Sequence, residues 1–142
     1  MSNFLPISLR HRTLTPSEIN QLSPVALAYI GDSVYELYVR GHYLFPPKRI
    51  KDYHRQVVES VRAEQQAHYL EDYFLPNLTA EELDVVRRGR NASPRPSRKM
   101  SVKIYQQATS FEALMGYLYL TNPDRLWALL DMLPFSSEAG EL

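Results

Sequence analysis

Cysteine is absent from the 142 residues of the chain. This absence excludes disulfide bonds and zinc sites built on thiolates, and it agrees with a reducing compartment. Charge of one sign is also missing, because 16 basic residues balance 16 acidic ones, so the global charge does not indicate a nucleic-acid-binding protein. The sequence has no run of the roughly 20 apolar residues that span a bilayer. Its first residues also lack the basic start and apolar stretch of a signal peptide, and we expect a cytoplasmic protein without a membrane segment.

Helical spacing of apolar residues recurs through most of the chain, whereas the alternating pattern of a half-buried strand does not appear. The prediction is therefore an all-α fold in a single domain. We expect an N-terminal arm over residues 1–14, the helical domain over 15–135 and a disordered tail over 136–142. Residues typical of helix starts, Pro, Gly and capping boxes place helices at 15–22, 23–41, 48–73 with one break, 79–89, 102–120 and 123–133.

The helix predicted at 23–41 has a clear start and an unusual middle. Ser23 is a good N-cap and Pro24 suits the first helical position, while Gly41 is predicted to end the helix in the left-handed conformation. Apolar residues lie on almost every side, which predicts a central, buried helix. Asp32 stands in the middle of it, beside Gly31. A buried carboxylate costs several kcal/mol unless a metal, a cation or a proton neutralises it.

A second acidic residue repeats this arrangement in the helix predicted at 102–120. Glu112 lies in a strongly apolar stretch, one turn before Gly116. Glycines on two central helices permit a close crossing that would place Asp32 beside Glu112, and two adjacent carboxylates need a cation between them. Oxygen ligands suit Mg²⁺, or Mn²⁺ in its place. The alternative is that each acid is structural, paired with an arginine or with hydroxyl groups.

Between these helices the composition changes to a basic segment. Residues 87–103 carry many cations, two prolines and no carboxylate. We interpret most of this segment as an exposed, mobile loop. Its alternative interpretation is a cationic surface that only interacts with water.

Three segments of the sequence resemble the ribonuclease III endonuclease domain, and more closely its mini-ribonuclease III branch, which lacks a separate double-stranded-RNA-binding domain. The first is LAYIGDSVYE at 27–36, the second RGRNA at 88–92 and the third FEALMGYLYL at 111–120. The segment between them also fits, at His54, Val61, Ala63, Gln66 and Ala67. The match runs in unbroken order from about residue 22 to residue 120, and three ordered motifs are far more specific than one Gly-Asp pair.

The resemblance implies a fold, an activity and partners. The fold is the helical bundle of that endonuclease domain, with 15–135 as the catalytic domain, and the activity is Mg²⁺-dependent hydrolysis of phosphodiester bonds in double-stranded RNA. Asp32 and Glu112 would be the catalytic metal ligands. The protein would act as a homodimer on the bacterial 23S ribosomal RNA precursor, maturing its 5′ and 3′ ends. Whether a ribosomal protein presents the substrate stays open. Full-length enzymes carry further acids where this chain has Val25, Ala28 and Thr109.

Further residues have expected roles around this site. Glu36 and His54 are candidates for an outer shell around the metal, although Glu36 is equally placed to pair with Arg40. The basic segment is expected to contact phosphates, since double-stranded RNA is recognised through its backbone and shape. Its candidate RNA-binding residues are Arg87, Arg88, Arg90, Asn91, Arg95, Arg98 and Lys99. Two rival hypotheses remain: a non-catalytic protein of the same fold that binds structured RNA, and an all-α protein-interaction domain.

Overall fold

A computed structural model describes residues 14–93 and 101–135 of the chain, and all its regular elements are helical, which confirms the predicted all-α class. None of the helices within these residues combines the length and hydropathy that a membrane crossing requires. The elements in chain order are α2 (Pro16–Asn20), α3 (Pro24–His42), α4 (Ile50–Val61), α5 (Ala63–Tyr69), the π-helical turn η2 (Leu70–Phe74), the 3-10 turn η3 (Leu75–Asn77), α6 (Ala80–Ala92), α7 (Val102–Thr121) and α8 (Pro123–Leu130).

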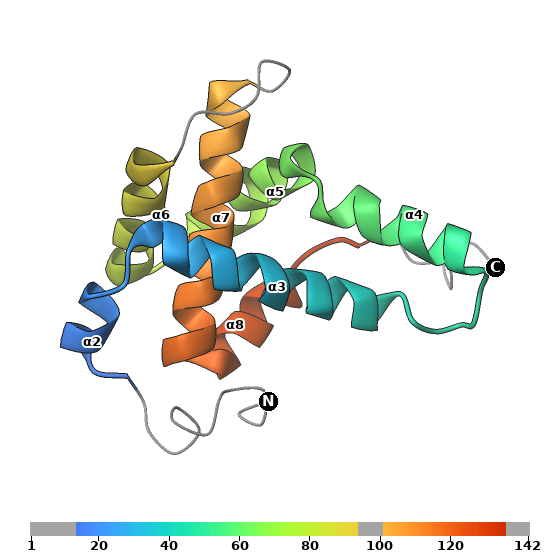
Figure 1. Ribbon diagram of the computed structural model, residues 1–142, viewed down its shortest axis with the longest axis horizontal. Helices are drawn as coiled ribbons and strands as arrows, with labels where there is room; N and C mark the ends of the chain where they lie inside the picture. The colour runs from blue at the N-terminus through green and yellow to red at the C-terminus, as the bar shows by residue number, and fades with distance from the viewer. Residues whose placement is uncertain (1–13, 94–100, 136–142) are drawn as a thin grey trace.

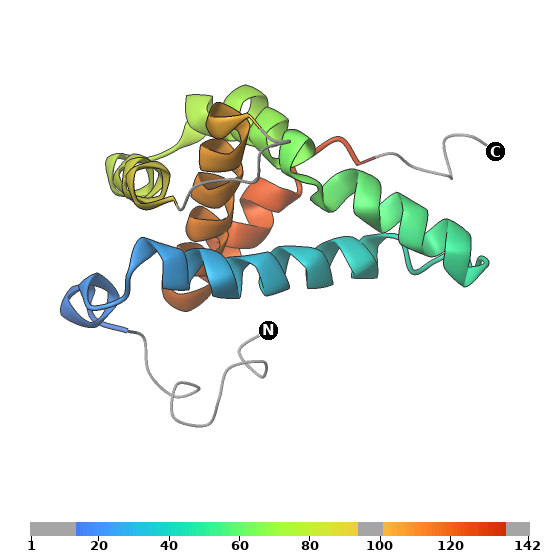
Figure 2. The same cartoon turned by 45° about the horizontal axis from the view of Figure 1, so that its top comes forward.

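The centre of the bundle is α7. It packs against α3, α5, α6 and α8, and Figure 1 shows it running through the body of the molecule while α3 crosses it. Its side chains Phe111, Leu114 and Met115 are completely buried. Turning the molecule in Figure 2 shows that α3 and α4 lie beside one another and extend together away from the rest of the bundle.

The helix α3 is less buried than its composition predicts. One face packs on α7 through Leu27 and Tyr35. The opposite face is open, with Val25 44 %, Tyr29 84 % and Leu37 51 % exposed. The prediction of a helix buried on all sides was therefore wrong, because apolar composition does not show which face finds a partner.

The predicted helix starts agree with the structure more closely than the predicted ends. Ser23 Oγ accepts a hydrogen bond from the Ala26 amide at 3.0 Å, and the capping boxes that begin α2 and α6 are both formed. Gly41, however, does not end α3, which continues to His42. The glycines within the described residues all lack a positive φ.

The end of α6 also differs from the prediction, and the reason is packing. The helix continues past Gly89 to Ala92. A Cβ atom at Gly89 would lie 3.1 Å from both Ser110 Cα and Ala113 Cβ. Gly89 therefore permits a close approach between α6 and α7 inside a helix, and the first residues of the predicted basic loop belong to the last turns of α6.

The single break predicted between residues 48 and 73 lies at Arg62. This residue is extended, with φ −66° and ψ 154°, and it separates α4 from α5. Buried hydroxyl groups hold the break: Tyr35 Oη donates to the Ser60 carbonyl at 2.7 Å, and Tyr43 Oη lies 3.3 Å from Ser60 Oγ. The carbonyl and the hydroxyl of Ser60 are thus bonded to Tyr35 of α3 and to Tyr43, the residue directly after α3.

Candidate functional site

The crossing of α3 and α7 is a contact between main chains. A Cβ atom at Gly31 would lie 1.8 Å from the Glu112 carbonyl oxygen, and one at Gly116 would lie 2.0 Å from the Leu27 carbonyl oxygen. Real Cβ contacts are never this short, and backbone atoms cannot move aside as a flexible side chain can. The two helices therefore approach to a distance that only glycine permits at these positions.

The two acidic residues meet at this crossing. Asp32 follows Gly31 on α3, and Glu112 precedes Gly116 by one turn of α7. Burial, together with a hydrogen bond and charge repulsion from Asp32, raises the pKa of the Glu112 carboxyl to about 8. The structure thus brings together the two carboxyls that the glycine pattern pairs, whereas their function as metal ligands stays a prediction.

The environments of the two acids differ from each other. Asp32 is exposed, so the expectation of a carboxylate buried in an apolar helix was wrong for this residue. It lies about one turn after exposed Tyr29 on α3. Glu112 is largely covered, which is why its pKa is raised. The site therefore has one side facing solvent and one side facing the core.

A third polar side chain at the site was missed as a functional residue. Gln66 on α5 is only 2 % exposed. Its Nε2 donates to the Val61 carbonyl at 3.1 Å and lies 3.5 Å from Glu112 Oε2. In the sequence, Gln66 was noted only because it fits the middle segment of the family pattern. That fit does not predict which residue the Gln66 side chain contacts.

The donor atoms at the crossing suit a hard divalent ion. Both groups are carboxylates, and carboxylate oxygen is a preferred ligand of Mg²⁺ and Mn²⁺. Burial and the neighbouring Asp32 carboxyl raise the pKa of Glu112, and a cation bound between the two carboxyls would lower it again. Within residues 14–93 and 101–135, His, Cys, Asp and Glu form no group of three or more that could hold a metal. The protein would thus supply two ligands, with water and phosphate completing the coordination of Mg²⁺.

The positions that carry further acids in full-length enzymes do not add ligands. Val25 lies on the open face of α3, and Ala28 is buried. Thr109 is buried as well, and its Oγ1 donates to the Tyr105 carbonyl at 3.0 Å.

The two outer-shell candidates have other surroundings. Arg40 Nη2 donates to Glu36 Oε2 at 2.9 Å, which is the alternative that the spacing left open. His54 is exposed on α4 and lines a small cavity with Arg40, Tyr53 and Val57.

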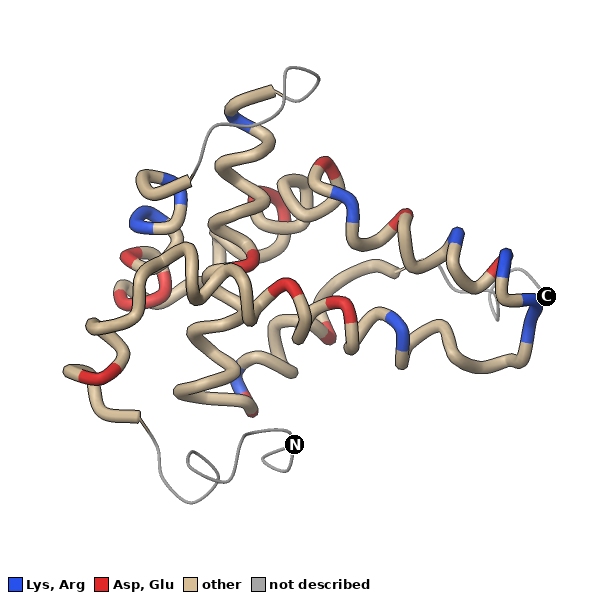
Figure 3. Tube along the Cα trace, in the orientation of Figure 1, with Lys and Arg blue, Asp and Glu red and all other residues tan. Residues whose placement is uncertain are grey.

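Four predicted RNA-binding residues lie on α6, while Arg95, Arg98 and Lys99 lie outside the described residues. Arg87, Arg90 and Asn91 belong to the last turns of the helix; Arg87 and Asn91 are exposed, and Arg87 forms an ion pair with Asp84. Figure 3 shows basic positions on the last turns of α6, basic and acidic positions along α4, and acidic positions near the crossing of α3 and α7. The basic end of α6 and the acidic pair thus lie on different elements of the fold.

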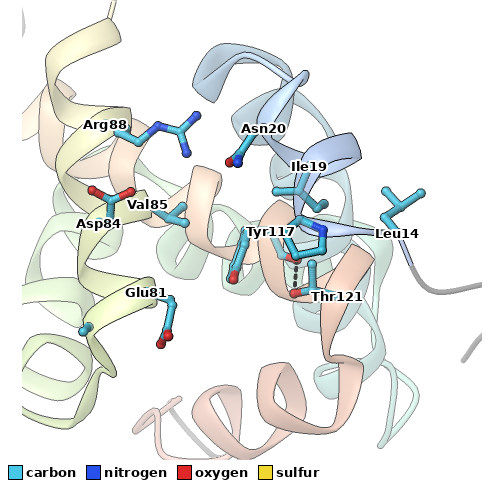
Figure 4. A pocket seen from close by; sticks show the side chains of 11 residues that line it. Leu14, Ile19, Asn20, Glu81, Asp84, Val85, Arg88, Tyr117 and Thr121 are labelled. Carbon is cyan, nitrogen blue, oxygen red and sulfur yellow. Dashed lines mark hydrogen bonds between the residues drawn. The ribbon is translucent and has the colours of Figure 1, made fainter.

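A larger cavity is separate from the acidic pair. It has a volume of about 560 Å³ and lies between α2, α6 and α7. Figure 4 shows Arg88, Asp84 and Glu81 of α6 on one side of it and Asn20 and Ile19 of α2 on the other. Arg88 lines this cavity and is half-buried, whereas Arg87 is exposed.

Comparison with known proteins connects this architecture to a family. Residues 25–123 match the ribonuclease III domain. A mini-ribonuclease 3 from Synechococcus sp. is 54 % identical, over 87 % of this chain and 88 % of the relative. One from Synechocystis sp. is 49 % identical, over 98 % and 99 % of the two chains. The crystal structure of protein FN1578 from Fusobacterium nucleatum superposes with a TM-score of 0.72 at 26 % identity, covering 77 % of this chain and 90 % of that one.

Proposed function

Because this chain belongs to the ribonuclease III family and is an endoribonuclease, we propose that it uses Mg²⁺ at Asp32 and Glu112 to cut a double-stranded stem of the bacterial 23S ribosomal RNA precursor. In this proposal the protein acts in the cytoplasm as a homodimer, and its cuts mature the 5′ and 3′ ends of the RNA. Mn²⁺ is the expected substitute for Mg²⁺.

One observation carries the assignment of the site. Asp32 and Glu112 are separated by 79 intervening positions in sequence, yet their carboxyls share a hydrogen bond at a crossing built on Gly31 and Gly116. Two adjacent carboxylates repel each other and destabilise a fold unless a cation or a proton neutralises them. A divalent ion bound there supplies Lewis-acid polarisation of a phosphate oxygen and lowers the pKa of an attacking water.

The side chains of the protein have distinct tasks in this mechanism. Asp32, exposed on α3, is the group that RNA and solvent reach first. Glu112, held at its raised pKa, must lose its proton before both carboxylates bind the metal. Loading of the site is therefore favoured as the pH rises toward about 8.

The open face of α3 supports the proposed homodimer. Val25, Tyr29 and Leu37 of α3 are exposed, and so are Phe45 and Ile50 beyond the helix, at 75 % and 78 %. Exposed apolar residues that gather on one surface are typical of an interaction site. A second copy of the chain packed against these apolar residues would cover them and bring two Asp32 residues into one assembly, as cutting both strands of a duplex requires, with Asp32 itself left open to the RNA.

The basic end of α6 supports RNA binding. Arg87 and Asn91 extend into solvent near the end of the helix, where they can meet phosphates without breaking buried contacts. Duplex RNA offers phosphates and 2′-hydroxyls over its accessible groove, so exposed cations are sufficient for binding without reading a base sequence.

A single pair of variants tests the activity. We expect Asp32→Asn to bind duplex RNA in Ca²⁺ with unchanged affinity, measured by gel shift, and to lose at least about a hundredfold of its cleavage rate in Mg²⁺, the scale of removing one electrostatic stabiliser. Asp124→Asn, an exposed acid at the start of α8, is the matched control and should cut normally. Near-normal cleavage by Asp32→Asn would remove the proposed metal site.

The substrate needs a separate experiment. Purified protein incubated with the ribosomal precursor, with and without ribosomal proteins, should yield cuts that map to the terminal stem. Binding of that stem without cuts by the unmodified protein in either metal would instead support the alternative, a non-catalytic protein that binds structured RNA.

A further inference from the structure

Gln66 is a buried polar side chain that the proposed mechanism leaves without a task. It lies on α5, which packs against α7, and only 2 % of it is exposed. A buried amide must satisfy its hydrogen-bonding groups inside the protein, because an unsatisfied one costs about 1 to 3 kcal/mol. An apolar residue of the same size would avoid that cost. The role of the Gln66 amide is therefore to be found in the hydrogen bonds that it makes.

The amide reaches two oxygen atoms through the same nitrogen. Nε2 carries two hydrogens; one contact leads to the Val61 carbonyl at 3.1 Å and the other to Glu112 Oε2 at 3.5 Å. Because both acceptors are oxygens, the donor end of the amide must face them. A glutamate at position 66 would have no proton to donate to either oxygen when ionised, and a methionine would fill the same space without any donor.

The contact with Val61 connects the site to the break between α4 and α5. Arg62 is extended there, so carbonyls on α4 lose their helical partners. Side chains replace those partners: Tyr35 of α3 binds the Ser60 carbonyl, and Gln66 of α5 binds the Val61 carbonyl. The break is therefore rigidly held, and it holds the Gln66 side chain at a set place beside α7.

We propose that Gln66 is the positioning residue of Glu112: its amide holds one carboxylate oxygen so that the side chain is oriented for a divalent ion before that ion arrives. This inference rests on the proposed metal site at Asp32 and Glu112. Residues that orient metal ligands in this way typically change metal affinity by roughly 10- to 100-fold when they are replaced.

Gln65 offers a matched control on the same helix. Its Nε2 donates to Tyr69 Oη at 2.8 Å, away from the carboxylates. Gln65→Met and Gln66→Met are therefore the same chemical change at adjacent positions, one outside the site and one inside it.

The test measures Mn²⁺ binding by calorimetry in the absence of RNA, and then the Mg²⁺ dependence of cleavage. We expect Gln66→Met to bind Mn²⁺ roughly tenfold or more weakly and to shift the Mg²⁺ midpoint of cleavage by a similar factor. The KM for duplex RNA and the rate at saturating Mg²⁺ should stay close to those of the unmodified protein, and Gln65→Met should match the unmodified protein throughout.

The other outcomes separate this inference from the proposed function. A lower melting temperature of Gln66→Met with an unchanged Mn²⁺ affinity would show a purely structural residue and overturn the inference alone. Failure of the unmodified protein to bind Mn²⁺ would overturn the metal site and, with it, the inference. If Gln66→Met does not fold, a crystal structure of the unmodified protein with Mn²⁺ decides: Gln66 Nε2 must lie within hydrogen-bonding distance of a metal-bound Glu112 carboxylate.

Discussion

The crossing of α3 and α7 and the end of α6 use opposite means to place charged groups. At the crossing, main-chain contacts through Gly31 and Gly116 hold the acidic pair at the body of the bundle. On the last turns of α6, Arg87 extends into solvent, and its ion pair is local and exposed. The first arrangement suits an ion that needs exact ligand positions, and the second suits phosphates, which attract cations over several ångströms.

The difference predicts how each region responds to substitution. A change of one atom at the crossing moves two helices, because their backbones touch. A change at the end of α6 removes one charge and leaves the bundle intact. Substitutions at the crossing should therefore change the free energy of unfolding. Substitutions at the end of α6 should change the salt dependence of RNA binding.

The largest expected effect comes from Gly31→Ala. Alanine favours a helix over glycine by about 1 kcal/mol, but its Cβ would lie 1.8 Å from the Glu112 carbonyl oxygen. The clash should win, with a loss of about 3 kcal/mol or more in the free energy of unfolding. Gly41→Ala is the control, because nothing lies within 4 Å of a Cβ there, and it should gain up to about 1 kcal/mol. Equal melting temperatures for the two variants would contradict the close crossing.

A smaller loss is expected from Arg125→Met, which tests how the start of α6 is fixed. Glu82, 4 % exposed, receives Arg125 Nε at 2.9 Å and Nη2 at 3.0 Å. Removing the arginine leaves a buried carboxylate without its cation, and urea unfolding should show a loss of about 2 to 3 kcal/mol. The salt dependence of RNA binding should not change. A shallower salt dependence would mean that Arg125 itself contacts RNA.

Substitution of the arginines at the other end of α6 should affect binding alone. Replacing Arg87 and Arg90 by alanine should weaken duplex binding and lower the slope of log K against log salt by about 1 for each arginine that binds a phosphate. Gel shifts at several salt concentrations measure this slope. Asp84→Asn is the useful comparison, because it removes the partner of Arg87 while keeping the cation, and it should not weaken binding. An unchanged slope in the double variant would exclude phosphate binding by this helix end.

The last prediction concerns pH and the metal-free protein. The folded-state pKa of Glu112 is raised from 4.5 to about 8, so its contribution to stability is present below pH 4.5 and is lost as the pH rises through about 8. Glu112→Gln should remove this part of the pH dependence and, without metal, melt at a higher temperature than the unmodified protein once the pH exceeds about 8. Saturating Mg²⁺ should reverse the order. Parallel pH dependences of the two melting temperatures would contradict the raised pKa.

The sequence was most informative where one residue has one local use. Thr15 and Thr79 begin helices because the capping box is a local motif, and the pairing of Asp32 with Glu112 followed from a glycine on each helix. The uses of Gly41 and Gly89 were assigned wrongly, because a glycine can end a helix or admit a neighbour and only the packing decides between them. The exposure of Asp32 and the contact of Gln66 depend on which helices lie nearby, which residue spacing along one helix does not report.

The break at Arg62 has a consequence for substitutions in the extended pair of helices, α3 and α4. Its carbonyls are capped by Tyr35 and Gln66, which lie on the bundle side of the junction. The inner end of α4 is therefore anchored at this junction, and Tyr53 ties its outer part to the Arg40 carbonyl of α3. Substitutions at exposed positions of this outer part should therefore leave the geometry of the crossing unchanged.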